Sequence, residues 1–105
     1  MSIHIYNVTI AVDPSIEERW KKWMLEIHIP EVLATGMFYG YTMTQVFPEQ
    51  EQEHPSFSVQ YRATDLESIK LYMQIYAPEL KEKSAKAWGN HALAFRTILE
   101  VLDEK

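Results

Sequence analysis

The order of apolar and polar residues predicts four strands and two long helical segments. The strands are expected over residues 3–12, 37–47, 56–63 and 92–102, where apolar side chains recur at every second position, as Val8, Ile10 and Val12 do. The segments between them carry apolar residues at helical spacing: Ile16, Trp20, Trp23, Met24 and Ile27 in the first, and Leu66, Ile69, Tyr72 or Met73, and Tyr76 in the second.

Prolines and glycines mark the ends of the first helical segment. Asp13 followed by Pro14 predicts a helix start, with the aspartate as the N-cap. Pro30 disfavours helical geometry at the residue before it, so the helix should end or kink near His28. Pro30 can open a further turn through residues 31–33, and Gly36 is the expected C-terminal stop.

The second helical segment repeats part of this pattern. Residues 64–67 match a capping box, Pro78 interrupts the helix, and Gly89 ends it. The segment 28–32 (HIPEV) aligns with 76–80 (YAPEL), each at the end of the main helix of its half. This echo indicates two related halves.

The resulting order, β-α-β-β-α-β, favours an α+β fold of the ferredoxin-like type. Right-handed crossovers would give one four-stranded antiparallel sheet with both helices on one face. No linker divides the chain, so residues 1–105 are expected to form a single domain.

The second face of this sheet is expected to be mostly neutral and polar. If the helices cover Val8, Ile10, Phe57, Val59, Phe95 and Leu99, alternation sends another set to the open side: Asn7, Thr9, Ser58, Gln60, Arg62, Arg96, Ile98 and Glu100. Both alternations of strand 37–47 carry large groups, so that strand is not assigned. Such a face indicates an interface or a shallow pocket, and pairing two copies would cover it. The alternative is a solvated monomer.

The composition of the chain excludes some classes of binding partner. The net charge is −5 and no basic face emerges, so neither nucleic acid nor an anionic membrane is an expected partner. No apolar run approaches the roughly 20 residues that span a bilayer. The chain has no cysteine and no signal peptide, which favours a cytoplasmic location.

The whole chain also resembles a known family. The stretches YNVTIAVDPSIEERWKKWMLEIHIPEVLATGMF, SVQY and AFRTILEV are similar to a family of short bacterial proteins of unknown function. That family is grouped with the dimeric α+β barrel superfamily, which includes antibiotic-biosynthesis monooxygenases. The resemblance implies a homodimer whose two sheets form a barrel with the helices outside, and it implies no reaction.

His28 is the first candidate for chemistry. A position at a helix C-terminus would favour its protonated form and raise its pKa, and the residue could then serve as a general acid or base. The alternative is a structural histidine whose imidazole binds the free carbonyls before Pro30.

Asn7 and Arg96 form the second candidate. Both are predicted on the open face of neighbouring strands, where an amide and a guanidinium could bind a carboxylate or an enolate-like oxygen. The alternative is a network within an interface, with Glu100 or a partner chain. The residues expected to contact a ligand beside this pair are Thr9, Tyr41, Ser58 and Gln60.

No metal or cofactor is expected. The histidines show no metal-ligand spacing, and the three tryptophans are expected in the core. The haem-degrading branch of the superfamily uses an asparagine on the first strand, a tryptophan on the third and a histidine on the second helix. Asn7 matches the first, but strand 56–63 has no tryptophan and segment 65–88 has no histidine.

Three functions stay open. The preferred one is a homodimer that binds a small organic molecule between sheet and helices, with no assigned reaction. The second is a cofactor-independent monooxygenase-like enzyme, or an isomerase or decarboxylase, acting on a small aromatic or enolisable compound. The third is a non-catalytic structural or regulatory dimer.

Overall fold

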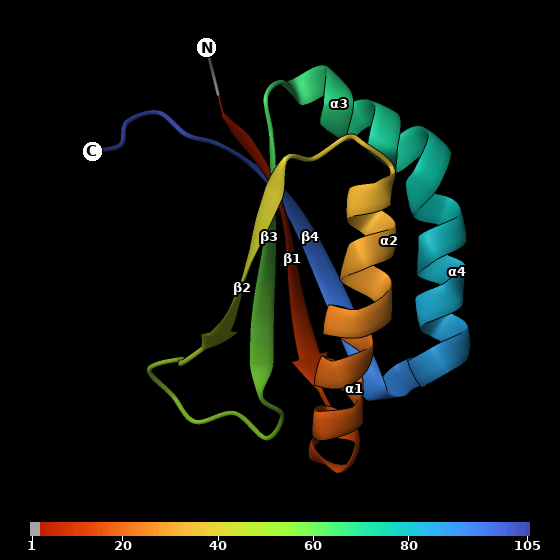
Figure 1. Cartoon of the computed structure of the whole chain (residues 1–105). Helices are drawn as coiled ribbons and strands as arrows, with labels where there is room; N and C mark the ends of the chain where they lie inside the picture. Colours follow the sequence, from red (N-terminus) through yellow and green to blue (C-terminus); the bar gives the residue numbers. More distant parts are fainter. Residues whose placement is uncertain (1–2) are drawn as a thin grey trace.

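The computed structural model describes residues 3–105, which form a sheet covered on one face by two antiparallel helical segments (Figure 1). The strands are β1 (His4–Val12), β2 (Gly40–Val46), β3 (Ser56–Ala63) and β4 (Ala92–Glu100). The main helices are α1 (Glu17–Trp23), α2 (Ile29–Ala34), α3 (Leu66–Leu71) and α4 (Ala77–Trp88). The order β-α-β-β-α-β confirms the predicted ferredoxin-like sandwich.

The sheet is fully antiparallel, with the strand order β2-β3-β1-β4. The register places Val8 of β1 opposite Val59 of β3 and Arg96 of β4. Residues directly opposite each other point to the same face, so this register fixes which side chains share a side. We call the side covered by helices the helix face and the other side the open face.

The first helical segment is continuous from Pro14 to Ala34, so the helix does not end near His28; a π turn lies where the sequence predicts an end or a kink. A 3₁₀ turn (Pro14–Ile16) leads into α1, and a π turn (Met24–His28) joins α1 to α2. The N–H of Ile29 donates to the Met24 carbonyl, five residues earlier. The wider turn accommodates Pro30, whose ring would clash with a carbonyl in a regular helix. Gly36, with φ of 78°, ends the segment as predicted.

The second helical segment also contains a π turn before a proline. A π turn (Tyr72–Tyr76) joins α3 to α4, and the N–H of Ala77 donates to the Tyr72 carbonyl just before Pro78. The two π turns therefore occupy matching places in the two halves, as the sequence echo indicated. The N-cap is Asp65, whose side chain accepts from the N–H of Ser68, and not Thr64 of the predicted capping box.

The extra residue of each π turn changes which side chains face the sheet. Ile27, predicted on the packing face, is 47% exposed, and of the alternatives Tyr72 and Met73 the buried one is Tyr72, at 4% against 43%. Ile29 and Ala77 are buried instead, at 1% and 2% exposure. A π turn shifts the inward face by one position, which a search for regular helical spacing does not detect.

The predicted face of β4 is also wrong. Arg96 pairs with Val8 and lies on the helix face, whereas Phe95 pairs with Thr9 and Leu99 with Ile5 on the open face. Ile98 and Glu100 pair with Tyr6 and His4, so they too belong to the helix face. Large apolar residues occupy both alternations of this edge strand, and only the pairing with β1 decides between them.

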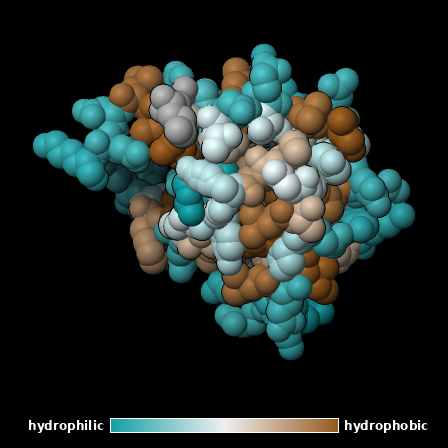
Figure 2. All heavy atoms as spheres, turned by 45° about the horizontal axis from the view of Figure 1, so that its top comes forward, coloured by the Kyte–Doolittle hydropathy of each residue, from teal (hydrophilic) through white to brown (hydrophobic). Residues whose placement is uncertain are grey.

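The core fills the space between the helices and β1 and β3. It includes Trp20 (2% exposed), Val59 (0%) and Ile69 (0%). Figure 2 shows apolar side chains in several separate places on an otherwise mostly hydrophilic surface. Within residues 3–105, no helix is both long and apolar enough to span a membrane.

Candidate functional site

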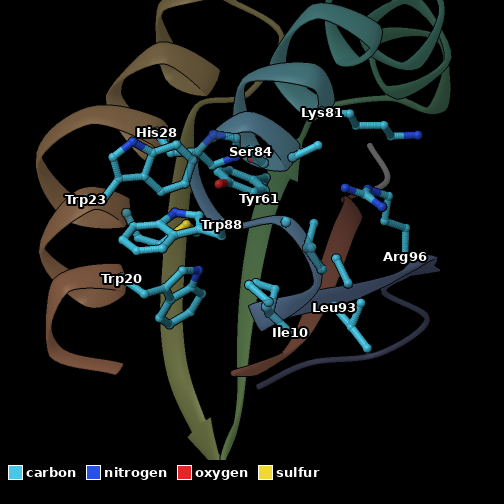
Figure 3. Close-up of a pocket in the computed structure, with 16 residues that line it drawn as sticks. Ile10, Trp20, Trp23, His28, Tyr61, Lys81, Ser84, Trp88, Leu93 and Arg96 are labelled. Atoms are coloured by element: carbon cyan, nitrogen blue, oxygen red, sulfur yellow. The ribbon is translucent and has the colours of Figure 1, made fainter. Parts of the chain in front are cut away.

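A cavity of about 260 Å³ lies between the helix layer and the β1–β4 side of the sheet (Figure 3). Its walls come from α1 and the first π turn, from α4, and from the helix face of β1 and β4. The space exists because β4 contributes small side chains to this face. Ala92 and Ala94 stand opposite Val12 and Ile10, whereas β3 places the larger Phe57 beside Ile10.

The three tryptophans of the chain all line this cavity. Trp20 is buried and packs on Phe57, with ring centroids 5.1 Å apart. Trp23 and Trp88 are partly buried and meet edge to face at 5.8 Å. Trp20 is thus a core residue as predicted, while Trp23 and Trp88 form walls of an open space.

His28 reaches the same cavity from the last position of the first π turn. Its imidazole stacks on the Trp23 ring at 5.0 Å with an interplanar angle of 18°. Burial lowers the pKa of His28 to about 4, opposed by the charge of Glu31 and reinforced by that of Arg96. The expected rise in pKa is wrong because His28 lies inside a continuous helix and not at its C-terminus, so the imidazole is neutral at pH 7.

Two buried nitrogens at the cavity have no hydrogen-bond partner among the described residues. They are Nδ1 of His28 and Nε1 of Trp88. Buried polar groups are normally satisfied, so each such atom calls for a water or a ligand. Both residues line the cavity, and a molecule there is within reach of both side chains.

A smaller recess of about 30 Å³ adjoins the cavity, with room for a single water. His28, Ser84, Lys81, Tyr61 and Arg96 line both spaces. In Figure 3, Lys81 and Arg96 lie on the side away from Trp20 and Trp23. The combined space therefore has an aromatic end and a basic end, and His28 lines both the cavity and the recess.

Three tyrosines close the recess from the core side. Burial raises the pKa of Tyr61 and Tyr72, whose phenols stay protonated. Burial also raises the pKa of Tyr6, and the nearby Arg96 charge offsets part of that effect. The recess is therefore bounded by neutral hydroxyl groups and two cations.

The predicted Asn7–Arg96 pair does not exist, because the sheet separates the two side chains. Asn7 pairs with Thr97 and Gln60 on the open face, and Arg96 lines the cavity on the helix face. Asn7 Oδ1 accepts from the Ser58 hydroxyl at 2.6 Å, and its Nδ2 donates to Thr97 at 3.2 Å. The asparagine is thus held in a network on the open face.

The other candidate ligand contacts are divided in the same way. Thr9, Ser58 and Gln60 share the open face with Asn7, whereas Tyr41 pairs with Tyr61 on the helix face. Tyr41 lies on β2, on the far side of β3 and β1 from β4, and lines neither of the two joined spaces. Of the residues predicted to act, the structure brings together His28 and Arg96.

Sequence reasoning missed Lys81, Ser84 and Trp88 as cavity residues. They recur at positions three and four apart along α4, which indicates one helical stripe. The stripe mixes a cation, a hydroxyl and an aromatic ring, so a pattern of apolar spacing does not reveal it.

Comparison with solved structures identifies the fold. An ethyl tert-butyl ether D (EthD) family protein from Bacillus halodurans aligns with a TM-score of 0.70 at 15% identity, covering 94% of this chain and 99% of that one. A dimeric ferredoxin-like protein from an uncultured marine organism gives 0.71 at 11% identity, covering 99% and 98%. A variant of SnoaB, a cofactor-independent oxygenase from Streptomyces nogalater, gives 0.63 at 10% identity, covering 98% and 95%.

At these identities the likeness concerns the fold alone, which is the ferredoxin-like fold of the dimeric α+β barrel proteins. No functionally curated protein gives a significant match. Residues 3–102 match a family described as a domain of unknown function, DUF4286. The chain belongs to the DUF4286 family.

Proposed function

We propose that this protein binds a small organic molecule in the cavity between its helices and its sheet. The observation that carries the proposal is the pair of unpartnered buried nitrogens, His28 Nδ1 and Trp88 Nε1, on residues of one aromatic-lined space. Binding sites typically combine apolar walls with a few such polar groups. Both side chains line the cavity, and a rotation of either ring would bring its unsatisfied nitrogen to a bound ligand.

The cavity volume limits the size of the ligand. An apolar cavity of about 150 Å³ accommodates benzene, and this one measures about 260 Å³. The space therefore suits a compound of one or two rings. The indole rings of Trp20, Trp23 and Trp88 in the cavity wall favour an aromatic molecule.

The tryptophans also supply the measurement. Their three indole N–H signals in a ¹H–¹⁵N NMR spectrum all report on the cavity. We expect 2-naphthamide or 2-naphthoate to shift these signals saturably. Ser84→Phe, which fills the cavity, should weaken binding at least tenfold.

Ala87→Phe is the matched control, because Ala87 is an exposed residue of the same helix that does not line the cavity. Circular dichroism checks that both variants are folded. If neither naphthyl compound binds, or if Ser84→Phe and Ala87→Phe bind like the parent, the cavity is not a binding site.

A second candidate is an enzyme acting on an enolisable compound, in the manner of cofactor-independent oxygenases, isomerases or decarboxylases. The neutral His28 imidazole, near the Arg96 cation, is the observation that favours it. A neutral imidazole accepts a proton from carbon, and a guanidinium stabilises the enolate oxygen that forms.

Deuterium exchange at C1 of 2-tetralone tests this chemistry. The imidazole would take the C1 proton, and the enolate would then take a deuteron from solvent. We expect exchange above the buffer rate that is lost in His28→Gln. Exchange at the buffer rate in the parent protein excludes this reaction, whereas binding without exchange supports the first proposal.

We also propose that the chain forms a homodimer through its open face. Within residues 3–105 no helix covers this face, and β4 exposes apolar side chains on it: Leu93 (54%), Phe95 (70%) and Leu99 (40%). A sheet normally buries its apolar side chains against another layer, and one structural neighbour is described as dimeric. A second copy would cover the apolar row of β4 and the polar network around Asn7.

Analytical ultracentrifugation tests the dimer. The parent should sediment as a dimer, and Phe95→Glu should sediment as a monomer. Leu25→Glu is the control, because Leu25 is an exposed apolar residue of the first π turn and lies away from the open face. A parent that stays monomeric at all concentrations would contradict the proposal. A protein that dimerises but binds no ligand in its cavity would favour the third function, a purely structural module.

A further inference from the structure

The space that holds the proposed ligand is chemically unequal at its two ends. One end is formed by Trp20, Trp23 and Trp88, and the other by Lys81 and Arg96. Figure 3 shows the two cations together, across the cavity from Trp20 and Trp23. A molecule that lies along this axis meets aromatic faces with one end and positive charge with the other.

Neither cation at the basic end has an acidic partner among residues 3–105. The salt bridges of α4 use Lys83, which pairs with Glu31 at 2.7 Å, and Lys86, which pairs with Glu82 at 3.2 Å. Lys81, on the same helix, forms no such pair, and Arg96 forms none on β4. Both cations line the cavity and the recess, where no carboxylate of the described residues neutralises them.

The neutral groups around Lys81 and Arg96 carry no negative charge that would balance these two cations. Tyr6, Tyr61 and Tyr72 line the recess as neutral phenols, and burial raises the pKa of each. Glu31 is close enough to affect the pKa of His28, but its carboxylate is bound by Lys83. The charge balance of the recess is therefore positive until a ligand brings an anion.

We propose that the ligand is a planar aromatic monoanion, a carboxylate or a phenolate, whose ring lies against the tryptophans that line the cavity and whose anionic oxygen lies between Lys81 and Arg96. This proposal rests on the cavity being a binding site. Guanidinium and ammonium groups bind such oxygens through charge-assisted hydrogen bonds. The unpartnered Trp88 Nε1 and His28 Nδ1 lie on side chains that line the path between the two ends.

The matched pair 2-naphthoate and 2-naphthamide separates charge from shape. Both have the same ring system and nearly the same size, and only the first is an anion at pH 7.5. We expect the parent to bind 2-naphthoate about tenfold more tightly than 2-naphthamide, as measured by titration of the three indole N–H signals.

Arg96→Gln combined with Lys81→Gln should reduce this preference to about one while leaving the affinity for 2-naphthamide within twofold. Lys86→Gln is the charge control, since Lys86 is an exposed cation of α4 that does not line the cavity. It should keep the tenfold preference, although it also lowers the net charge of the protein.

The outcomes separate the two proposals. Equal affinity for amide and carboxylate in the parent overturns the anion inference and leaves the cavity as a binding site. A preference for 2-naphthoate that survives the double substitution also overturns it, because groups other than Lys81 and Arg96 must then bind the carboxylate. Failure of both compounds to bind overturns the proposed function together with the inference.

Discussion

The helix face and the open face of the sheet differ along every strand, and the contrast is sharpest at two adjacent residues of β3. Phe57 points to the helices, is 3% exposed and packs on Trp20. Ser58 points to the open side, is 7% exposed and donates to Asn7. On β1 and β3, the helix face carries large packed side chains, and the open face carries short polar groups that bind each other.

This difference shows why the cavity lies on the helix face. A layer of large side chains leaves space wherever a neighbouring strand supplies small ones, as Ala92 and Ala94 do beneath Trp88. The open face has no second layer, so its short side chains enclose nothing in a single chain. Three measurements test this contrast, beginning with the largest effect.

Replacing Phe57 by alanine should destabilise the protein most. Loss of a buried phenylalanine costs about 3 to 5 kcal/mol, through lost burial and the cavity left behind. Urea denaturation of the parent and Phe57→Ala measures the difference in unfolding free energy. A cost below that of Ser58→Ala would show that the helix face is not the main source of stability.

Lowering the pH should reduce the unfolding free energy of the protein through protonation of His28, which is buried on the helix face. Its pKa is about 4 in the folded protein and 6.5 in an exposed reference. Between these values the unfolded chain binds more protons, so the unfolding free energy falls as the pH falls. A shift of this size corresponds to about 2 to 3 kcal/mol lost between pH 6.5 and pH 4.

Urea titrations at several pH values in this window, on the parent and on His28→Gln, isolate that contribution. The parent should lose more stability than His28→Gln, whereas His54→Gln, which alters an exposed loop histidine, should follow the parent. Parallel pH profiles for the parent and His28→Gln would mean that His28 is not buried in neutral form.

Ser58→Ala should have the smallest effect. It removes the hydrogen bond to Asn7, and a net contribution of about 1 kcal/mol is typical. Urea denaturation measures this loss of unfolding free energy, and sedimentation shows whether the Ser58→Ala variant still forms a dimer. A loss above 3 kcal/mol would place the open-face network on a level with the core.

Much of the fold could be predicted from the sequence because it depends on local patterns. Alternation located β1 and β3 within a residue of their observed bounds, and Asp13 and Gly36 act at the first helical segment as their chemistry requires. The repeated proline segments indicated two related halves, and both halves contain a π turn at that place.

The site could be predicted only in part. The sequence points to both His28 and Arg96 as candidates. It also predicts Arg96 on the same face as Asn7, whereas the two residues lie on opposite faces of the sheet. Strand β4 carries large apolar residues on both alternations, so its own sequence does not select a face. Ile27 was expected inside and is outside, since one extra residue in a turn rotates everything after it.

By itself, the sequence determined the element order, the strand pairing class and the C-terminal ends of the two helical segments, because these depend on neighbouring residues and on the chirality of crossovers. Tertiary structure alone decided the register of β4 and the phase of the helices beyond each π turn. Those two choices place His28, Trp88, Lys81 and Arg96 around one space. They depend on pairing and packing between segments far apart in the chain, which no local pattern encodes.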